Sequence, residues 1–92
     1  MPKLTAAQVK KELASLPGWT RKRLSITRLY EFKDFVTAIK FVDDVAKIAE
    51  RANHHPDIDI RWNKVRLTLS THDEGGLTEK DMTLARRFNS LA

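Results

Sequence analysis

Two neighbouring stretches of the chain alternate between apolar and polar residues, and this pattern constrains the fold more than any other. Every second position of residues 57–62 and of residues 64–71 is apolar up to Leu69: Ile58, Ile60, Trp62, Val65, Leu67 and Leu69. A period of two places the apolar side chains of a strand on one face, and two such runs joined by a short turn predict a β-hairpin. One face of this hairpin must therefore be buried under another layer of structure.

The position of the turn sets the register of the hairpin. We expect Asn63 and Lys64 to form a two-residue turn, because Asn tolerates positive φ. Continued outward, this register places His55 opposite His72, with Cα atoms ~5 Å apart if the ladder extends that far. Pro56 cannot donate to a ladder, so pairing is expected to fray there. Even if the strands do not pair beyond Pro56, we expect His55 and His72 to converge at the open end of the hairpin, on the face away from the apolar core.

Helical periodicity and turn residues predict the remaining elements. Three helices are expected, at residues 5–15, 34–52 and 77–92. Two further strands are expected at residues 18–21 and 24–32, with a bulge where alternation breaks between Ile26 and Leu29. The order α-β-β-α-β-β-α, with strands in adjacent pairs, predicts an α+β two-layer sandwich: a four-stranded antiparallel sheet with three helices on one face. We expect one domain over residues 1–92, with a flexible start at residues 1–4.

Capping residues mark the starts of the helices. Thr5 and Asp34 are expected N-caps, and Thr78 is expected to cap the last helix with Asp81 at N3, in a capping-box arrangement. The helix at residues 34–52 also carries a second apolar row beside its main stripe: Phe41, Val45, Ile48 and Ala52. Either this row contacts another subunit or the helix is deeply buried.

Composition excludes several classes of protein. The 92 residues include no cysteine, so disulfides and thiolate metal sites are absent. No apolar run is long enough to span a bilayer and the N-terminus lacks a signal-peptide pattern, so we expect a cytoplasmic protein. The net charge is +5, but 17 basic residues are interspersed with 12 acidic ones, and this mixed pattern argues against a nucleic-acid partner.

The chain has three histidines, and two of them are adjacent where the long helix ends: His54 and His55, with His72 after the hairpin. Imidazoles exchange protons near neutral pH, so a pocket lined by them suits general acid–base chemistry. Glu50, one helical turn before His54, can hydrogen-bond one of these rings. The residues leave two alternatives open: a zinc site completed by Asp57 or Asp81, and histidines that merely end a helix and a strand.

The stretch "HHPDIDIRWNKVRLTLSTHDEGGLTEKD" resembles the signature of the pterin-4a-carbinolamine dehydratases. That family shows His-His-Pro, an aromatic-Asn hairpin, Leu-Ser/Thr-Thr-His and Gly-Leu-Thr/Ser-x-x-Asp, and all four pieces occur here in order. The opening "LTAAQVKKELASLPGW" is also similar to the N-terminus of the family. The resemblance implies a hydro-lyase that converts 4a-hydroxytetrahydropterin to quinonoid dihydropterin and water, recycling the cofactor of aromatic amino acid hydroxylases. It further implies a homodimer or homotetramer and no metal or organic cofactor.

Carried onto this chain, the resemblance implies a set of site residues. We expect His55 and His72 to be the acid–base pair, with His54 as a third catalytic participant. The supporting residues are Asp81, expected to orient His72, together with Glu50 and Pro56, and the expected hydrogen-bond partners of the pterin are Ser70 and Thr71. Trp62 has the wrong parity for the pocket and is expected in the core. A non-catalytic alternative remains, because animal members of the family also serve as dimerisation cofactors of a transcription factor.

Overall fold

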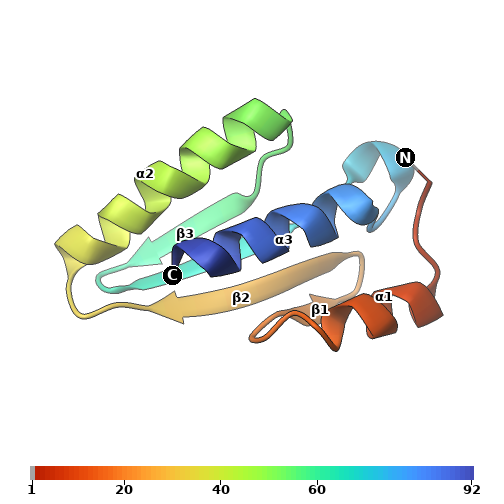
Figure 1. The fold of residues 1–92 in the computed structure, drawn as a ribbon, viewed down its shortest axis with the longest axis horizontal. Coiled ribbons are helices and arrows are strands. Elements are labelled where there is room, and N and C mark those ends of the chain that lie inside the picture. The colour runs from red at the N-terminus through yellow and green to blue at the C-terminus, as the bar shows by residue number, and fades with distance from the viewer. Residues whose placement is uncertain (1) are drawn as a thin grey trace.

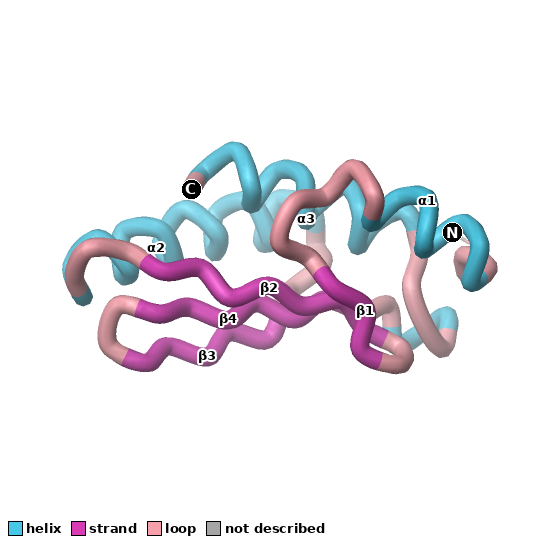
Figure 2. Tube along the Cα trace, turned by 90° about the horizontal axis from the view of Figure 1, so that it is seen from below, coloured by secondary structure: helices cyan, strands magenta, loops and turns pink. Residues whose placement is uncertain are grey.

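The structure, a computed structural model, describes residues 2–92 and has the α+β two-layer architecture expected from the sequence. Its elements are α1 (Ala6–Leu13), β1 (Thr20–Lys22), β2 (Ser25–Glu31), α2 (Phe35–Ala52), β3 (Asp57–Arg61), β4 (Lys64–Leu69), a short 3₁₀ helix η1 (His72–Glu74) and α3 (Glu79–Leu91). Figure 1 shows α3 between α2 and α1, and Figure 2 shows all three α-helices on one side of the sheet. No helix within residues 2–92 is long and apolar enough to cross a membrane.

The four strands form one antiparallel sheet in the order β1-β2-β4-β3. The two central strands pair without interruption from Ile26 opposite Leu69 to Glu31 opposite Lys64. The bulge expected between Ile26 and Leu29 is therefore wrong. Alternation in β2 breaks for a different reason: Leu29 faces away from the helices and is 44% exposed, while Tyr30 faces the core.

The β3–β4 hairpin turns one residue earlier than expected, which shifts each pairing partner by two residues, so the predicted register is wrong. Arg61 pairs with Lys64 and Ile58 pairs with Leu67, which makes Trp62 and Asn63 the turn residues. Trp62 adopts a φ of 54° and is 66% exposed, so its expected place in the core is also wrong. A register shift of two residues leaves every side chain on its expected face, because the side-chain period of a strand is two.

Asn63 explains why the turn lies there. Its side-chain amide donates to the carbonyl of Phe32 at 2.7 Å, and the Phe32 N–H donates to the Asn63 carbonyl at 2.9 Å. The buried side chain of Asn63 thus ties the turn to the segment that leaves β2. These tertiary hydrogen bonds place a Trp in a position with positive φ, which bulky residues otherwise avoid.

The helices begin at the expected caps. The Asp34 carboxylate accepts the Thr37 N–H at 2.8 Å, and this hydrogen bond holds the pKa of Asp34 below its usual value. Thr5 and Thr78 both form capping boxes, the latter with Asp81 at N3. Near the N-terminus the Leu4 N–H donates to the Leu77 carbonyl at 2.8 Å. The single-domain boundary and the flexible start at residues 1–4 stay predictions.

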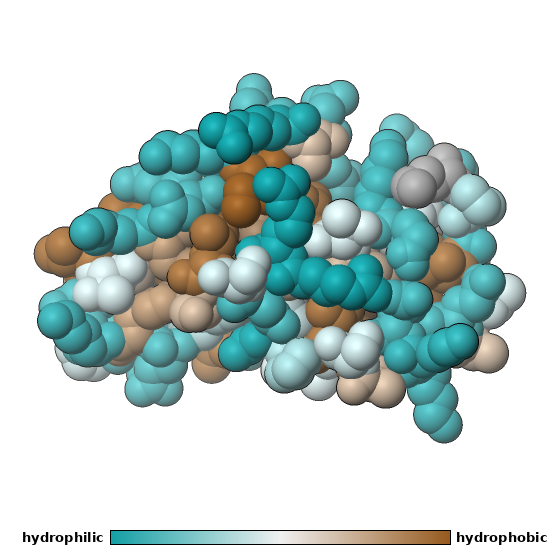
Figure 3. Space-filling model, viewed as in Figure 1, coloured by the Kyte–Doolittle hydropathy of each residue, from teal (hydrophilic) through white to brown (hydrophobic). Residues whose placement is uncertain are grey.

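The core lies between the sheet and the helices. Alternate residues of β4 and several residues of α3 are fully buried in this core: Val65, Leu67, Leu69, Met82, Ala85 and Phe88. From the expected second row of α2, Phe41 and Val45 are buried and Ile48 is partly buried against this core. The large apolar residues that α2 exposes lie at its N-terminus instead, where Phe35 is 49% and Val36 is 69% exposed. Figure 3 views the helix face, where apolar side chains gather between α2 and α3.

The side chain of Asn89 links α3 to strand β2 and to the residue before β1. Its side-chain oxygen accepts hydrogen bonds from Trp19 Nε1 at 2.9 Å, from an Arg28 guanidinium nitrogen at 2.6 Å and from the Tyr30 hydroxyl. The Arg28 guanidinium also stacks over the Tyr30 ring, 4.3 Å from its centroid. Burial raises the pKa of Tyr30, and the nearby Arg28 charge opposes that rise. The hydroxyl therefore remains a hydrogen-bond donor at neutral pH.

Candidate functional site

The junction between α2 and β3 places the paired histidines. Asn53 ends α2 in the left-handed conformation, with a φ of 51°, and so redirects the chain. Pro56 follows and favours extended backbone for the residue before it, so His55 leaves the helix. The three histidines line one cavity of about 300 Å³, together with Asn53, Ser70, Thr71, Asp73 and Lys80. The convergence of His55 and His72 is confirmed, although the register that predicted direct opposition is wrong.

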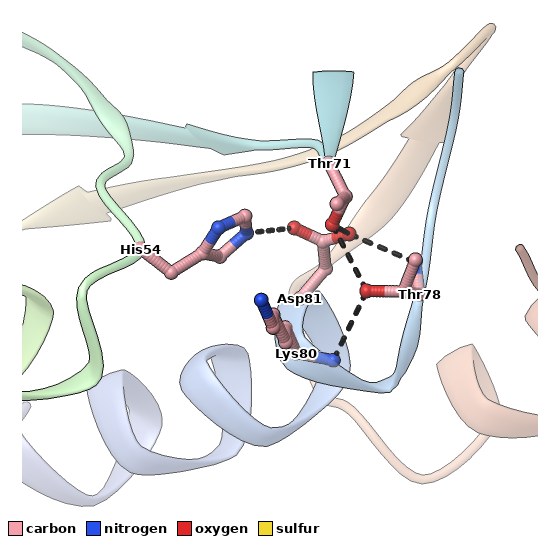
Figure 4. Close-up of polar contacts among 5 residues, drawn as sticks. All are labelled: His54, Thr71, Thr78, Lys80 and Asp81. Carbon is pink, nitrogen blue, oxygen red and sulfur yellow. Dashed lines mark hydrogen bonds and ion pairs between the residues drawn. The ribbon is translucent and has the colours of Figure 1, made fainter. Parts of the chain in front are cut away.

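His54 is held by a buried network that Figure 4 shows in close-up. Its Nε2 lies 2.6 Å from Asp81 Oδ1, while Asp81 Oδ2 accepts the Thr71 hydroxyl at 2.8 Å and the Thr78 backbone N–H at 3.0 Å. The Thr71 and Thr78 hydroxyls are themselves 2.9 Å apart. The side chain of Asp81 is 0% exposed and that of His54 is 12% exposed. A buried carboxylate is stable only when it is paired and hydrogen-bonded, and Asp81 meets both conditions.

This network corrects the expected partner of Asp81 and gives Thr71 a different role from the expected one. Asp81 contacts His54 rather than His72, because α3 packs against α2 and brings its first turn to the end of that helix. Thr71 is one of the two expected hydrogen-bond partners of the pterin, but its hydroxyl is buried and engaged by Asp81 and Thr78. From the sequence alone, Thr78 is expected only to cap α3. Its spacing from Asp81 was the available signal, because a capping box brings both side chains together.

The other two histidines are less constrained. His55 Nε2 lies 2.7 Å from Glu50 Oε1, which confirms the expected contact between Glu50 and one imidazole. Both side chains are well exposed, at 56% and 81%, so water competes for this contact. His72 is exposed, and its side chain makes no hydrogen bond or ion pair with other residues of the described chain. The site thus combines one fixed imidazole with two that are free to meet a ligand.

A second, larger cavity of about 410 Å³ adjoins the first on the face of the sheet opposite the helices. It is lined by Leu24, Ser25, His55, Asp57, Thr68, Ser70, His72, Gly75 and Gly76. His55, Ser70 and His72 line both cavities. The two cavities are therefore neighbours that share these three residues. Their polar lining carries groups that exchange protons and groups that hydrogen-bond.

The arrangement suits proton transfer. Across residues 2–92, no group of three or more His, Asp or Glu side chains has a geometry that could hold a metal ion. Imidazoles that face a cavity from different elements can donate a proton to one atom of a bound molecule and accept one from another. The arrangement of the three imidazoles around these cavities is therefore compatible with acid–base chemistry on a small molecule.

The chain belongs to the pterin 4 alpha carbinolamine dehydratase family, whose sequence profile matches residues 2–91. A protein of Acidobacterium capsulatum that is named as a candidate pterin-4-alpha-carbinolamine dehydratase is 53% identical over 91 residues, covering 99% of both chains. A similarly named protein of Chloroflexus aurantiacus is 50% identical over 91 residues, covering 99% of this chain and 98% of its own. The resemblance seen in the sequence is thus confirmed.

Solved structures agree on the fold. The crystal structure of a transcriptional coactivator/pterin dehydratase from Brucella melitensis superposes with a TM-score of 0.95 at 40% identity, covering 98% of each chain. A pterin dehydratase-like protein described as a RuBisCO assembly factor in the alpha-carboxysome has a TM-score of 0.67 at 24% identity, covering 80% of this chain and 86% of its own. At that identity the second structure shows the shared fold alone.

Proposed function

We propose that this protein dehydrates 4a-hydroxytetrahydropterin to quinonoid dihydropterin and water. The observation that carries the proposal is that His55 and His72 line the same two cavities from separate elements, in a chain that belongs to the dehydratase family. The product would return to the pterin pool used by aromatic amino acid hydroxylases. We expect the reaction to take place in the cytoplasm.

The reaction requires two proton transfers, one to the hydroxyl group on C4a and one from the neighbouring atom N5. The C4a–O bond breaks as the hydroxyl accepts a proton and leaves as water, while N5 loses its proton and forms a double bond to C4a. An imidazolium supplies the first proton and a neutral imidazole takes the second, which restores the total charge of the pair. His55 and His72 are the proposed acid–base pair, since both are exposed to the cavity and neither is buried in a network.

The neighbouring residues take supporting roles in this proposal. His54, fixed by Asp81, binds substrate or shuttles protons from the wall of the smaller cavity. Glu50 orients His55, and Pro56 shapes the junction that presents it. Ser70 lines both cavities and offers a hydroxyl to the pterin, whereas the Thr71 side chain acts on Asp81.

The protein is further proposed to form a homodimer or homotetramer. Large apolar side chains are exposed at the start of α2, on the edge strand β3 and at the hairpin turn: Phe35, Val36, Ile58, Ile60 and Trp62. Burial of such side chains between subunits is favourable, and a domain of this size gains stability from it. Light scattering on the purified protein tests this proposal, and a monomer at all concentrations would contradict it.

The test of the activity compares three proteins. The rate of dehydration of 4a-hydroxytetrahydropterin, generated in situ, is measured for the wild type, for a His55→Ala, His72→Ala double variant and for a Lys40→Ala control. Lys40 is an exposed residue of α2 that lines neither cavity. We expect acceleration over the spontaneous reaction by the wild type and the control, and its loss in the folded double variant. No acceleration by the wild type would refute the activity and favour a protein-interaction role.

A further inference from the structure

The larger cavity contains one carboxylate for which the acid–base mechanism has no use. Asp57 is the first residue of β3, and it is the only acidic side chain among the residues described as lining this cavity. Its carboxylate makes no hydrogen bond or ion pair with any residue of the range 2–92. Asp59, two residues further along the same face, differs on both counts: it lies 3.2 Å from the Arg61 guanidinium and lines a separate cavity with Leu29, Arg61, Lys64 and Arg66.

We propose that Asp57 is a specificity-determining residue that binds the 2-amino-4-oxo edge of the pterin. This inference rests on the proposed function and names the group that recognises the substrate's pyrimidine ring. The N3–H and the 2-amino group are adjacent donors that point in the same direction. A carboxylate offers two acceptor oxygens in a matching arrangement and binds such a donor pair with two hydrogen bonds.

The position of Asp57 relative to the histidines fits the shape of the substrate. In the pyrimidine ring, C2 lies directly across from C4a, the carbon that loses its hydroxyl. A group that binds the 2-amino edge must therefore stand about one ring width from the groups that exchange protons at C4a and N5. Asp57 and His55 lie two residues apart in extended chain, which separates their Cα atoms by roughly 6–7 Å and directs both side chains to the same face.

The opposite strand extends this arrangement. Asp57 pairs with Thr68 across the sheet, and Ser70 and His72 follow Thr68 toward the same end of the cavity as His55. The cavity thus has a carboxylate at the first residue of the edge strand β3 and imidazoles beyond the ends of β3 and β4. A ring anchored at Asp57 by its 2-amino edge extends C4a toward the imidazoles. An open volume of about 410 Å³ is within the range of small-molecule sites.

The experiment compares Asp57→Asn with Asp59→Asn, two isosteric changes on one strand and one face. Steady-state dehydration kinetics are measured for both, together with the binding of pterin and of lumazine, which carries a 2-oxo group in place of the 2-amino group. We expect Asp57→Asn to raise KM about 10- to 100-fold, as loss of a charged hydrogen-bond pair does, with kcat changed less than about threefold. Asp59→Asn is expected to match the wild type.

Ligand preference provides the decisive readout. A carboxylate favours pterin over lumazine, whereas the amide of Asp57→Asn presents one donor and one acceptor and so complements the 2-oxo and N3–H groups of lumazine. We expect the preference to invert in Asp57→Asn and in no other variant. An unchanged preference and KM in Asp57→Asn would overturn the inference while leaving the dehydratase activity in place. If the wild type accelerates no dehydration, the proposed activity fails, and the binding preference alone still decides the role of Asp57.

Discussion

Replacement of Asp81 by Asn is the most informative single perturbation of this protein. The change preserves the size of the side chain and removes its charge. An amide can keep one oxygen toward the Thr71 hydroxyl and the Thr78 N–H, where Asp81 Oδ2 now accepts both. Its NH₂ group then faces His54 Nε2, which is 2.6 Å from Asp81 Oδ1. The charge-assisted contact with His54 is therefore the interaction that is lost.

The expected cost follows from two contributions. A hydrogen bond to a charged group is worth about 1.5–3 kcal/mol, and a carboxylate in the first turn of a helix adds about 0.3–1 kcal/mol through the helix dipole. We therefore expect Asp81→Asn to lower the free energy of unfolding by about 2–4 kcal/mol. For a domain of this size each kcal/mol corresponds to about 4–8 °C, so the melting temperature should fall by roughly 8–32 °C.

Thermal unfolding followed by circular dichroism at pH 7 measures this loss. Glu79→Gln is the matched control, because Glu79 also lies in the first turn of α3 but makes no contact with His54. The control should lose only the dipole contribution, less than about 1 kcal/mol. If both variants lose the same stability, the His54–Asp81 contact adds nothing and the reasoning is refuted.

Three further perturbations have clear expected outcomes. Thr71→Val deletes the hydroxyl that donates to Asp81, so it should lower the free energy of unfolding by about 1–3 kcal/mol and slow dehydration. Thr71→Ser keeps a hydroxyl and should restore both properties. Equal behaviour of the two variants in melting and rate assays would contradict the role of the hydroxyl. Asn89→Ala leaves three donors without their shared acceptor and should cost about 1–3 kcal/mol in urea unfolding, with Ser90→Ala as a near-neutral neighbour. The folded pKa of Asp34 is lowered, so its contribution to stability is present above the unfolded pKa and is lost as pH falls through the folded value. Melting curves of the wild type and Asp34→Asn should therefore differ at pH 7 and converge as the pH falls below the folded pKa of Asp34, and a difference that does not depend on pH would refute this linkage.

The hairpin shows how far the sequence could predict the fold. Strict alternation set the two strands and their faces correctly, because a misplaced turn that shifts the register by two residues preserves the faces. The turn itself was misplaced because local preference favours Asn over Trp at positive φ. The hydrogen bonds between Asn63 and Phe32 decide the outcome, and they join residues 31 positions apart, beyond the reach of a turn rule.

The site was predictable in composition but only partly in its contacts. The resemblance to the family and the sequence positions of the three histidines were enough to predict that these side chains meet at one end of the hairpin. The partner of Asp81 was not predictable, since it depends on how α3 packs against α2. Asp57 was considered only as a metal ligand, because its place in the larger cavity depends on the true register and on the chain near Leu24 and Gly75.

Asp81 also has a consequence for the motions of the molecule. Its carboxylate caps the first turn of α3 and also holds the ring of His54. The N-terminus of α3 and the wall of the pocket should therefore unfold locally together. Local unfolding proceeds in cooperative units of this kind, and amide hydrogen exchange measures their opening free energy. The exchange rate of the Thr78 amide therefore reports on the order of the pocket. A ligand that contacts His54 should slow that exchange even though it never touches the helix.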